Sequence, residues 1–207
     1  VIVYLDQEEQ AGVDLLQQSE AYMQSLRGDR VSMIFQEPNA ALNPTLSIGD
    51  QVSETFLFHQ SREMCAKIMQ DLSLPECRLF YPLKNIQLSL YRRASKNPEA
   101  FSLKVMNRVP FLKSWQKRLK KEAWQRAIDI IDKLGIPNAE QVAEQYPHNL
   151  SGGMKQRIVI AIALACNPVL LIADEATSNL DVTIQAQILD LLRRLKEEDL
   201  SSILLIT

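Results

Sequence analysis

The fold is decided by Leu170-Leu171-Ile172-Ala173-Asp174-Glu175, an apolar run that ends in two adjacent carboxylates. Short apolar runs bounded by polar residues are typical of a strand buried in a parallel sheet. In open parallel sheets, ligands gather beyond the carboxyl ends of the strands. We therefore expect Asp174 and Glu175 to lie at a ligand-binding edge. Neighbouring residues on an extended backbone point in different directions, so the two acids need not do the same work.

Helix and strand patterns alternate on both sides of this strand. Upstream, Val31-Ser32-Met33-Ile34-Phe35 has strand composition, and apolar residues recur at helical spacing from Ile48. Downstream, Asp181 is placed as the N-cap of a helix that runs to about Glu198. Ile203-Leu204-Leu205-Ile206 then predicts a further buried strand. This alternation predicts an α/β fold, with parallel strands joined by helical crossovers.

The middle of the chain is strongly basic. Residues 84–126 contain twelve Lys or Arg and two Glu, although the whole chain has a formal net charge of −2. This asymmetry indicates an inserted or separate subdomain with its own surface role. Basic residues interspersed with aromatics suit nucleic acid or an anionic membrane surface, but we prefer a solvated helical insertion. From Glu122 a regular helical face resumes, and Gly135 ends it.

The composition excludes several other classes of protein. With 46% hydrophobic and 23% charged residues, the chain is expected to bury one substantial core. Its most apolar stretch, residues 158–173, is interrupted by an Asn-Pro pair and is shorter than the roughly 20 residues that a membrane-spanning helix needs. No secretory signal is visible. Three widely spaced cysteines give no metal-site or disulfide pattern, which favours a reducing compartment.

A second motif, Leu150-Ser151-Gly152-Gly153-Met154-Lys155-Gln156-Arg157, opens an apolar helix. Ser151 can cap this helix, and the two glycines leave its first N–H groups uncovered by side chains. Such a helix start attracts phosphate through its free donors and partial positive charge. An isolated S-G-G is more often a capped tight turn. The acidic pair that begins 23 positions after Ser151 favours the phosphate site instead.

Together these motifs resemble the nucleotide-binding subunit of an ABC transporter. Residues 150–157 match that family's signature, and residues 170–181 are similar to its Walker B strand, catalytic glutamate and D-loop. Residues 33–38, with Leu42-Asn43-Pro44, are similar to the Q-loop region of the oligopeptide and dipeptide importer branch. Tyr146-Pro147-His148 and residues 181–187 indicate the same branch. The resemblance covers residues 1–60 and 120–207.

The resemblance implies a fold and a division of the chain. The fold would be an α/β, P-loop NTPase-like parallel sheet core, incomplete here, with an α-helical signature subdomain. Residues 1–44 would be part of the core with the Q-loop, and residues 45–150 would form the α-helical subdomain. Its basic insertion would cover about residues 61–121, a stretch that is longer than usual in the family. Residues 151–207 would return to the core with the signature helix, the Walker B strand, the D-loop and the helix and strand that follow.

The resemblance also implies ATP and Mg2+ as cofactors. Asp174 and Gln36 would hold the Mg2+, since that ion prefers a few oxygen ligands plus phosphate. Glu175 and Gln36 would be catalytic, with Glu175 orienting and polarising the attacking water. Gln36 would in addition sense the membrane subunits.

A second ATPase subunit, identical or different, is the first implied partner. Ser151, Gly152 and Gly153 would bind the γ-phosphate of ATP held mainly by that subunit, and Asp181 would cross the dimer interface. Transmembrane permease subunits are the next implied partners, with an extracytoplasmic solute-binding protein engaged indirectly. The expected location is peripheral, on the cytoplasmic face of the cell membrane.

Three features depart from the family pattern. No G-x-x-x-x-G-K-[ST] phosphate loop occurs among the six glycines, and the chain ends at Thr207, before the position of the family's switch histidine. Truncation at both ends would produce these two departures, so we expect a fragment that is inactive by itself. Ala176 stands where the family usually has proline, and Ser178-Asn179 also differ. Ala176 restores a backbone N–H and loosens φ, which predicts a slight shift of Glu175 rather than lost chemistry.

The function implied is that of an ABC-type ATPase which powers import of oligopeptides, dipeptides or a related solute such as nickel. Two alternatives stay open. One is a non-transport ABC ATPase that acts on nucleic acid through the basic insertion, although nucleic acid is not the expected partner. The other is a fragment that docks to partners without binding ATP.

Overall fold

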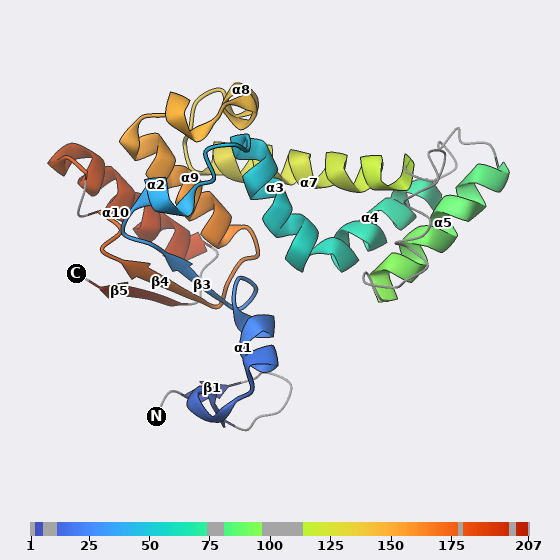
Figure 1. Cartoon of the computed structure of the whole chain (residues 1–207), viewed down its shortest axis with the longest axis horizontal. Coiled ribbons are helices and arrows are strands. Elements are labelled where there is room, and N and C mark those ends of the chain that lie inside the picture. The colour runs from blue at the N-terminus through green and yellow to red at the C-terminus, as the bar shows by residue number, and fades with distance from the viewer. Residues whose placement is uncertain are drawn as a thin grey trace.

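The computed structural model describes residues 3–5, 12–73, 81–96, 114–177, 180–198 and 202–206. Figure 1 shows a small sheet with helices packed over it and an arm of helices reaching away from it. A two-stranded antiparallel ribbon comes first in the chain, β1 (Val3–Leu5) with β2 (Gly12–Asp14). A 3-10 turn (Leu15–Gln17) and α1 (Glu20–Leu26) then lead into the main sheet.

Three parallel strands form the main sheet, in the order β3-β4-β5. They are β3 (Val31–Ile34), β4 (Leu170–Asp174) and β5 (Ser202–Ile206). Two long helices connect and cover them, α9 (Gly152–Leu164) before β4 and α10 (Val182–Glu198) between β4 and β5. The predicted parallel strands with helical crossovers are confirmed.

One face of the described sheet is covered and the other is open. Parallel register aligns Ser32 and Leu171 on the covered face, where both are buried. It also aligns Met33, Ile172 and Leu204 on the opposite face, where Met33 is 37% and Leu204 is 50% exposed. In Figure 1 the helices α9 and α10 lie over the same side of the sheet. The face that carries Met33, Ile172 and Leu204 therefore has no described helix above it.

The prediction that Ile203-Leu204-Leu205-Ile206 is a buried strand is therefore wrong about burial. The segment is a strand, but Leu204 and Leu205 are each 50% exposed and Ile206 is 44% exposed. β5 is the last strand at its edge of the described sheet, so one side of it has no neighbouring strand. Burial of an apolar strand depends on its place in the sheet, which its composition does not reveal.

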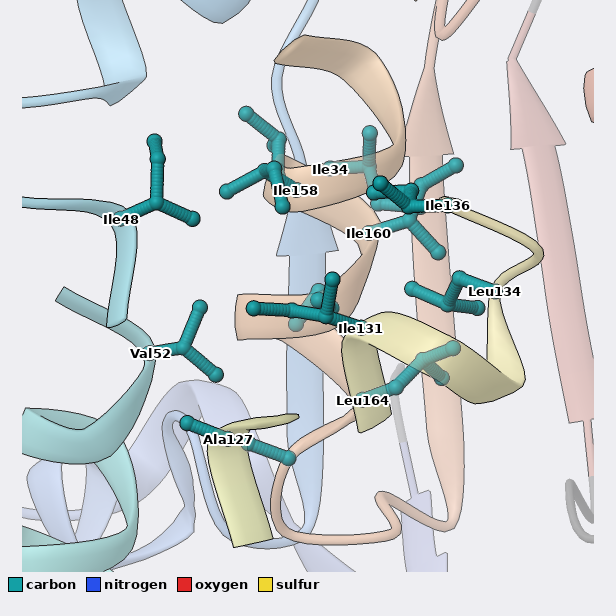
Figure 2. Close-up of a cluster of buried hydrophobic side chains, with 14 of the residues drawn as sticks. Ile34, Ile48, Val52, Ala127, Ile131, Leu134, Ile136, Ile158, Ile160 and Leu164 are labelled. Carbon is teal, nitrogen blue, oxygen red and sulfur yellow. The ribbon is translucent and has the colours of Figure 1, made fainter. Parts of the chain in front are cut away.

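The main core lies where α9 meets the covered face of the sheet and the helices that precede it. These are α3 (Ile48–His59), α7 (Ser114–Lys133) and α8 (Ala139–Glu144). Figure 2 shows apolar side chains of α3 and α7 lying close to those of α9, and α8 adds Ala139, Val142 and Ala143 to the same cluster. Ile48 and Val52, which recur at helical spacing, are fully buried, as are Ala127, Ile131 and Leu134. Each large apolar side chain buried in this way stabilises the fold by about 1.5–3 kcal/mol.

The arm has a smaller core of its own. α4 (Ser61–Ser73) packs on α5 (Tyr81–Lys96) through a cluster that Leu119 of α7 joins to the main core. Its buried members are Cys65, Ile68, Leu72, Leu90, Tyr91 and Ala94. Residues 74–80 and 97–113 of the predicted basic insertion lie outside the described residues. α7 begins at Ser114, earlier than the helical face expected from Glu122, since this basic first part packs through Leu119.

Among the described helices, none combines the length and apolar character needed to cross a membrane. The division at residues 44 and 150 stays a prediction.

Candidate functional site at the carboxyl ends of β3 and β4

Two segments leave the sheet side by side. After β3 the chain passes through Gln36 into α2 (Pro38–Ala41), a single turn that begins with proline. After β4 it passes through Glu175 toward α10. Because β3 pairs with β4 in parallel, with Ile34 opposite Ala173, both exits lie at the same edge of the sheet. This is the edge at which ligands bind in open parallel sheets.

The structure brings Gln36 and Glu175 into direct contact. Gln36 Nε2 donates a hydrogen bond to Glu175 Oε2 at 2.6 Å, across 139 positions of sequence. A hydrogen bond to a charged acceptor at this distance is among the stronger polar contacts in proteins. The two residues expected to act on water and metal thus share one hydrogen bond.

The backbone at Glu175 differs from the expected extended form. Its φ is +42°, in the left-handed region that residues other than glycine, asparagine and aspartate rarely adopt. The Glu175 N–H donates to the carbonyl oxygen of Ile206 at 2.9 Å, so the strained residue is tied to β5. Asp174 ends β4 in extended form and is half-buried. The chain therefore turns at Glu175, directly after the end of β4.

Ser151 caps the signature helix α9, as predicted. Its Oγ accepts a hydrogen bond from the backbone N–H of Met154 at 3.3 Å. The two glycines that follow differ from each other. A Cβ on Gly152 would meet only Leu180 Cδ2, at 3.8 Å, whereas a Cβ on Gly153 would lie 2.9 Å from Ile184 Cγ2. Gly152 thus leaves the helix start open, and Gly153 allows α9 to approach α10, a packing reason that the sequence did not reveal.

A cavity of about 350 Å3 lies between α2 and the start of α9. Its lining residues are Gln36, Glu37, Pro38, Asn39, Gly152, Lys155, Gln156, Ala176 and Leu180. Lys155 Nζ reaches α2 and donates to Asn39 Oδ1 at 2.9 Å. Gln156 is only 1% exposed, and its amide nitrogen has no hydrogen-bond partner among the described residues. Sequence reasoning missed these roles, although Lys155 and Gln156 lie two and three residues after Gly153.

Asp181 has the N-cap role predicted for it. Its Oδ1 accepts from the Ile184 N–H at 3.0 Å, and its side chain is exposed. Gln185 holds the preceding loop through bonds from Nε2 to the carbonyl oxygens of Thr177 and Leu180, both at 2.9 Å. Ser178-Asn179 lie outside the described residues. Asp181 is thus presented on the surface by a braced loop.

The donor atoms near this edge are those that a hard divalent cation prefers. Asp174 and Glu175 offer carboxylate oxygens, and Gln36 offers an amide oxygen because its nitrogen is engaged with Glu175. Within the described residues, no cluster of three or more His, Cys, Asp or Glu could hold a metal ion. The set suits Mg2+, which usually takes one or two carboxylates and fills its remaining positions with water and phosphate oxygens.

Comparison with known proteins gives one family and many relatives. The family model described as "ABC transporter" matches residues 2–178. The oligopeptide transport ATP-binding protein AppD of Bacillus subtilis (strain 168) is 41% identical over 182 residues, which are 88% of this chain and 38% of AppD. The dipeptide transport ATP-binding protein DppD of the same organism is 36% identical over 194 residues, 94% of this chain and 41% of DppD. The chain therefore spans about two fifths of the length of these relatives.

Solved structures show the same fold. A dimeric, post-hydrolysis state of the ATP-binding cassette MJ0796, bound to ADP and Pi, superposes with a TM-score of 0.56 and 21% identity, over 96% of this chain and 60% of that one. CbiO1 from Clostridium perfringens, part of the complex cbiONQ, gives a TM-score of 0.54 over 96% of this chain and 53% of its own. The predicted α/β, P-loop NTPase-like fold is confirmed.

Proposed function

The chain belongs to the ABC transporter family, and on that basis we propose that it is part of an ATPase. This ATPase powers import of oligopeptides or dipeptides, or of a related solute such as nickel. The Gln36–Glu175 hydrogen bond is the observation that carries this proposal, because it joins the Q-loop and Walker B segments at one edge of the sheet. The names of AppD and DppD support peptides as the solute class. The 207 residues contain no glycine-lysine phosphate loop, so the activity is proposed for the full-length protein.

The chemistry is phosphoryl transfer to water, in which positioning and electrostatics supply nearly all of the catalysis. Glu175 orients the attacking water and polarises it by accepting a hydrogen bond from it. Gln36 donates a hydrogen bond to the Glu175 carboxylate and so keeps that carboxylate oriented toward the attacking water. Asp174 and the Gln36 amide oxygen would hold Mg2+, which when bound neutralises charge on the phosphate oxygens.

A second ATPase subunit completes the nucleotide site in this proposal. Ser151, Gly152 and Gly153 bind the γ-phosphate of the ATP held by that subunit, and Asp181 crosses the interface. The exposed, uncovered helix start at Gly152 supports this role, since free N–H groups there favour an anion. The exposed side chain of Asp181 is accessible to a partner while it caps α10.

The proposed partners and location follow the family. Permease subunits in the membrane would receive the motion of the ATPase, and the solute-binding protein would act through them. The protein would lie peripherally on the cytoplasmic face of the membrane.

The test is Glu175→Gln in the full-length protein. We expect ATP binding to persist while turnover falls by roughly 10²-fold or more, the usual range for loss of a positioned base. Glu140→Gln, on the exposed surface of α8, is the matched control and should leave turnover unchanged. A Glu175→Gln protein that hydrolyses ATP at the normal rate would show that the role assigned to Glu175 is wrong. Peptide uptake by cells carrying each variant tests the transport half of the proposal.

A further inference from the structure

The α2 turn, which carries Gln36 at its entrance, is weakly anchored by packing. It has four residues, its N-cap Glu37 makes no side-chain capping bond, and Asn39, Ala40 and Ala41 are exposed. One turn of helix has no stability of its own, because nucleation costs more than a single turn recovers. Something other than helix formation must therefore hold the segment in place.

A cavity lies between α2 and the signature helix α9, beside the contact that the two elements make. Beneath it, the buried Gln156 amide nitrogen makes no hydrogen bond to a described residue, so this donor does not hold α2 either. Leaving such a donor unsatisfied costs about 1–3 kcal/mol. Polar contacts from neighbouring elements therefore matter for the position of α2.

Four contacts hold the segment within the part of the chain that the structure describes. At one end Gln36 bonds Glu175, and at the other Leu42 is buried and Gln51 bonds the backbone of Asn43 at 2.8 and 3.0 Å. Between them, Lys155 Nζ donates to Asn39 Oδ1 at 2.9 Å, the one side-chain hydrogen bond between α2 and α9 among the described residues. Both residues of this bond line the cavity.

We propose that Lys155 is a positioning residue, which keeps Gln36 seated on Glu175 by anchoring α2 to the signature helix through Asn39. Lys155 lies two residues after Gly153, so the helix start proposed to meet the partner's nucleotide and the Gln36–Glu175 pair are joined by one side chain. A displacement of the α9 start is thereby passed to Gln36. This inference rests on the ATPase function proposed above.

The first experiment replaces Lys155 by Met in the full-length protein. We expect kcat for ATP to fall roughly three- to tenfold, the range for losing one ordinary hydrogen bond, with KM for ATP unchanged. Lys155→Arg should restore most of the rate, because it keeps a cation within reach of Asn39. Lys120→Met, an exposed lysine of the arm, is the control and should change nothing.

A double-mutant comparison separates positioning from a general structural role. If Lys155 acts through Gln36, then Lys155→Met should cost nothing further in a Gln36→Ala background. Asn39→Ala should match Lys155→Met, and the two together should be no worse than either. A full additional loss in the Gln36→Ala background would overturn the inference, as would a lowered melting temperature that Lys155→Arg does not restore.

Amide hydrogen exchange gives a readout that does not need turnover. Residues 36–41 should exchange faster in Lys155→Met than in the wild type, while the core helix α3 stays protected. Unchanged exchange over residues 36–41 would refute the anchoring role. A wild-type protein with no ATPase activity would instead refute the proposed function, and the exchange result would still decide the inference.

Discussion

Gln36 and Glu175 each lie two residues beyond a pair of aligned strand positions, Ile34 and Ala173, and their side chains meet at 2.6 Å. Parallel pairing of β3 with β4 brings both exits to the same edge. The left-handed backbone of Glu175 turns the chain at this point. A contact between residues 139 positions apart thus follows from strand register and one local turn.

Gln36→Glu should damage this contact more than Gln36→Ala. Two carboxylates in place of an amide and a carboxylate repel each other, so Glu175 would move away from its present position. We expect turnover of ATP by the full-length protein to fall at least about tenfold, the low end of the range for a displaced catalytic group. Steady-state ATPase assays at saturating ATP check this. A Gln36→Glu rate above that of Gln36→Ala would contradict it.

Gly153→Ala and Gly152→Ala should have different effects. The new Cβ at residue 153 would lie 2.9 Å from Ile184 Cγ2, so α9 and α10 must shift apart, at a cost of about 1–3 kcal/mol for overpacking. At residue 152 the nearest atom is 3.8 Å away, so folding should be unaffected while the methyl group covers the helix start and lowers turnover. Thermal melts and ATPase assays on both variants separate the effects. Equal melting temperatures for the two variants would contradict the packing role of Gly153.

Asp181 can be tested for two roles with two substitutions. Asp181→Ala removes the acceptor for the Ile184 N–H and should cost about 1 kcal/mol of stability. Asp181→Asn keeps an acceptor, so the stability should be nearly retained. Urea denaturation measures both variants. If Asp181→Asn is stable yet lowers ATP turnover, the loss reports the proposed interface role and not the cap.

Glu122 should make the free energy of unfolding depend on pH in the acid range. Burial raises its pKa, but hydrogen bonds from Lys67 at 2.6 Å and Arg126 at 3.2 Å outweigh burial and lower the pKa below 4.5. Because the folded state binds this proton less readily than the unfolded state, the stabilisation is present above pH 4.5 and is lost as the pH falls through the lowered value.

Glu122→Gln tests this sign. The variant should be less stable than wild type near neutral pH, and the difference should shrink as the pH falls below 4.5. Urea denaturation at a series of pH values measures the difference. Glu54→Gln, on the exposed surface of α3, is the control and should show no such trend. A stability difference that is constant across the acid range would contradict the pKa shift.

Much of the local structure could be predicted from sequence because it depends on neighbours in the chain. The apolar run before Asp174 predicted β4, and Ser151 and Asp181 were identified as N-caps from the helical patterns that follow them. Apolar residues at helical spacing predicted the buried faces of α3 and α7. Each of these features depends on backbone preference and periodicity within a few residues.

The sequence by itself thus determined the elements, their caps and the types of residue at the site. Only the tertiary structure decided that Gln36 touches Glu175, that Lys155 bonds Asn39 of α2, and that Gly153 faces Ile184. It also decided that β5 is exposed, against the expectation from its composition. The reason is physical: strand register, helix approach and edge position arise from contacts between distant segments, and a local pattern of apolar and polar residues is compatible with several such arrangements.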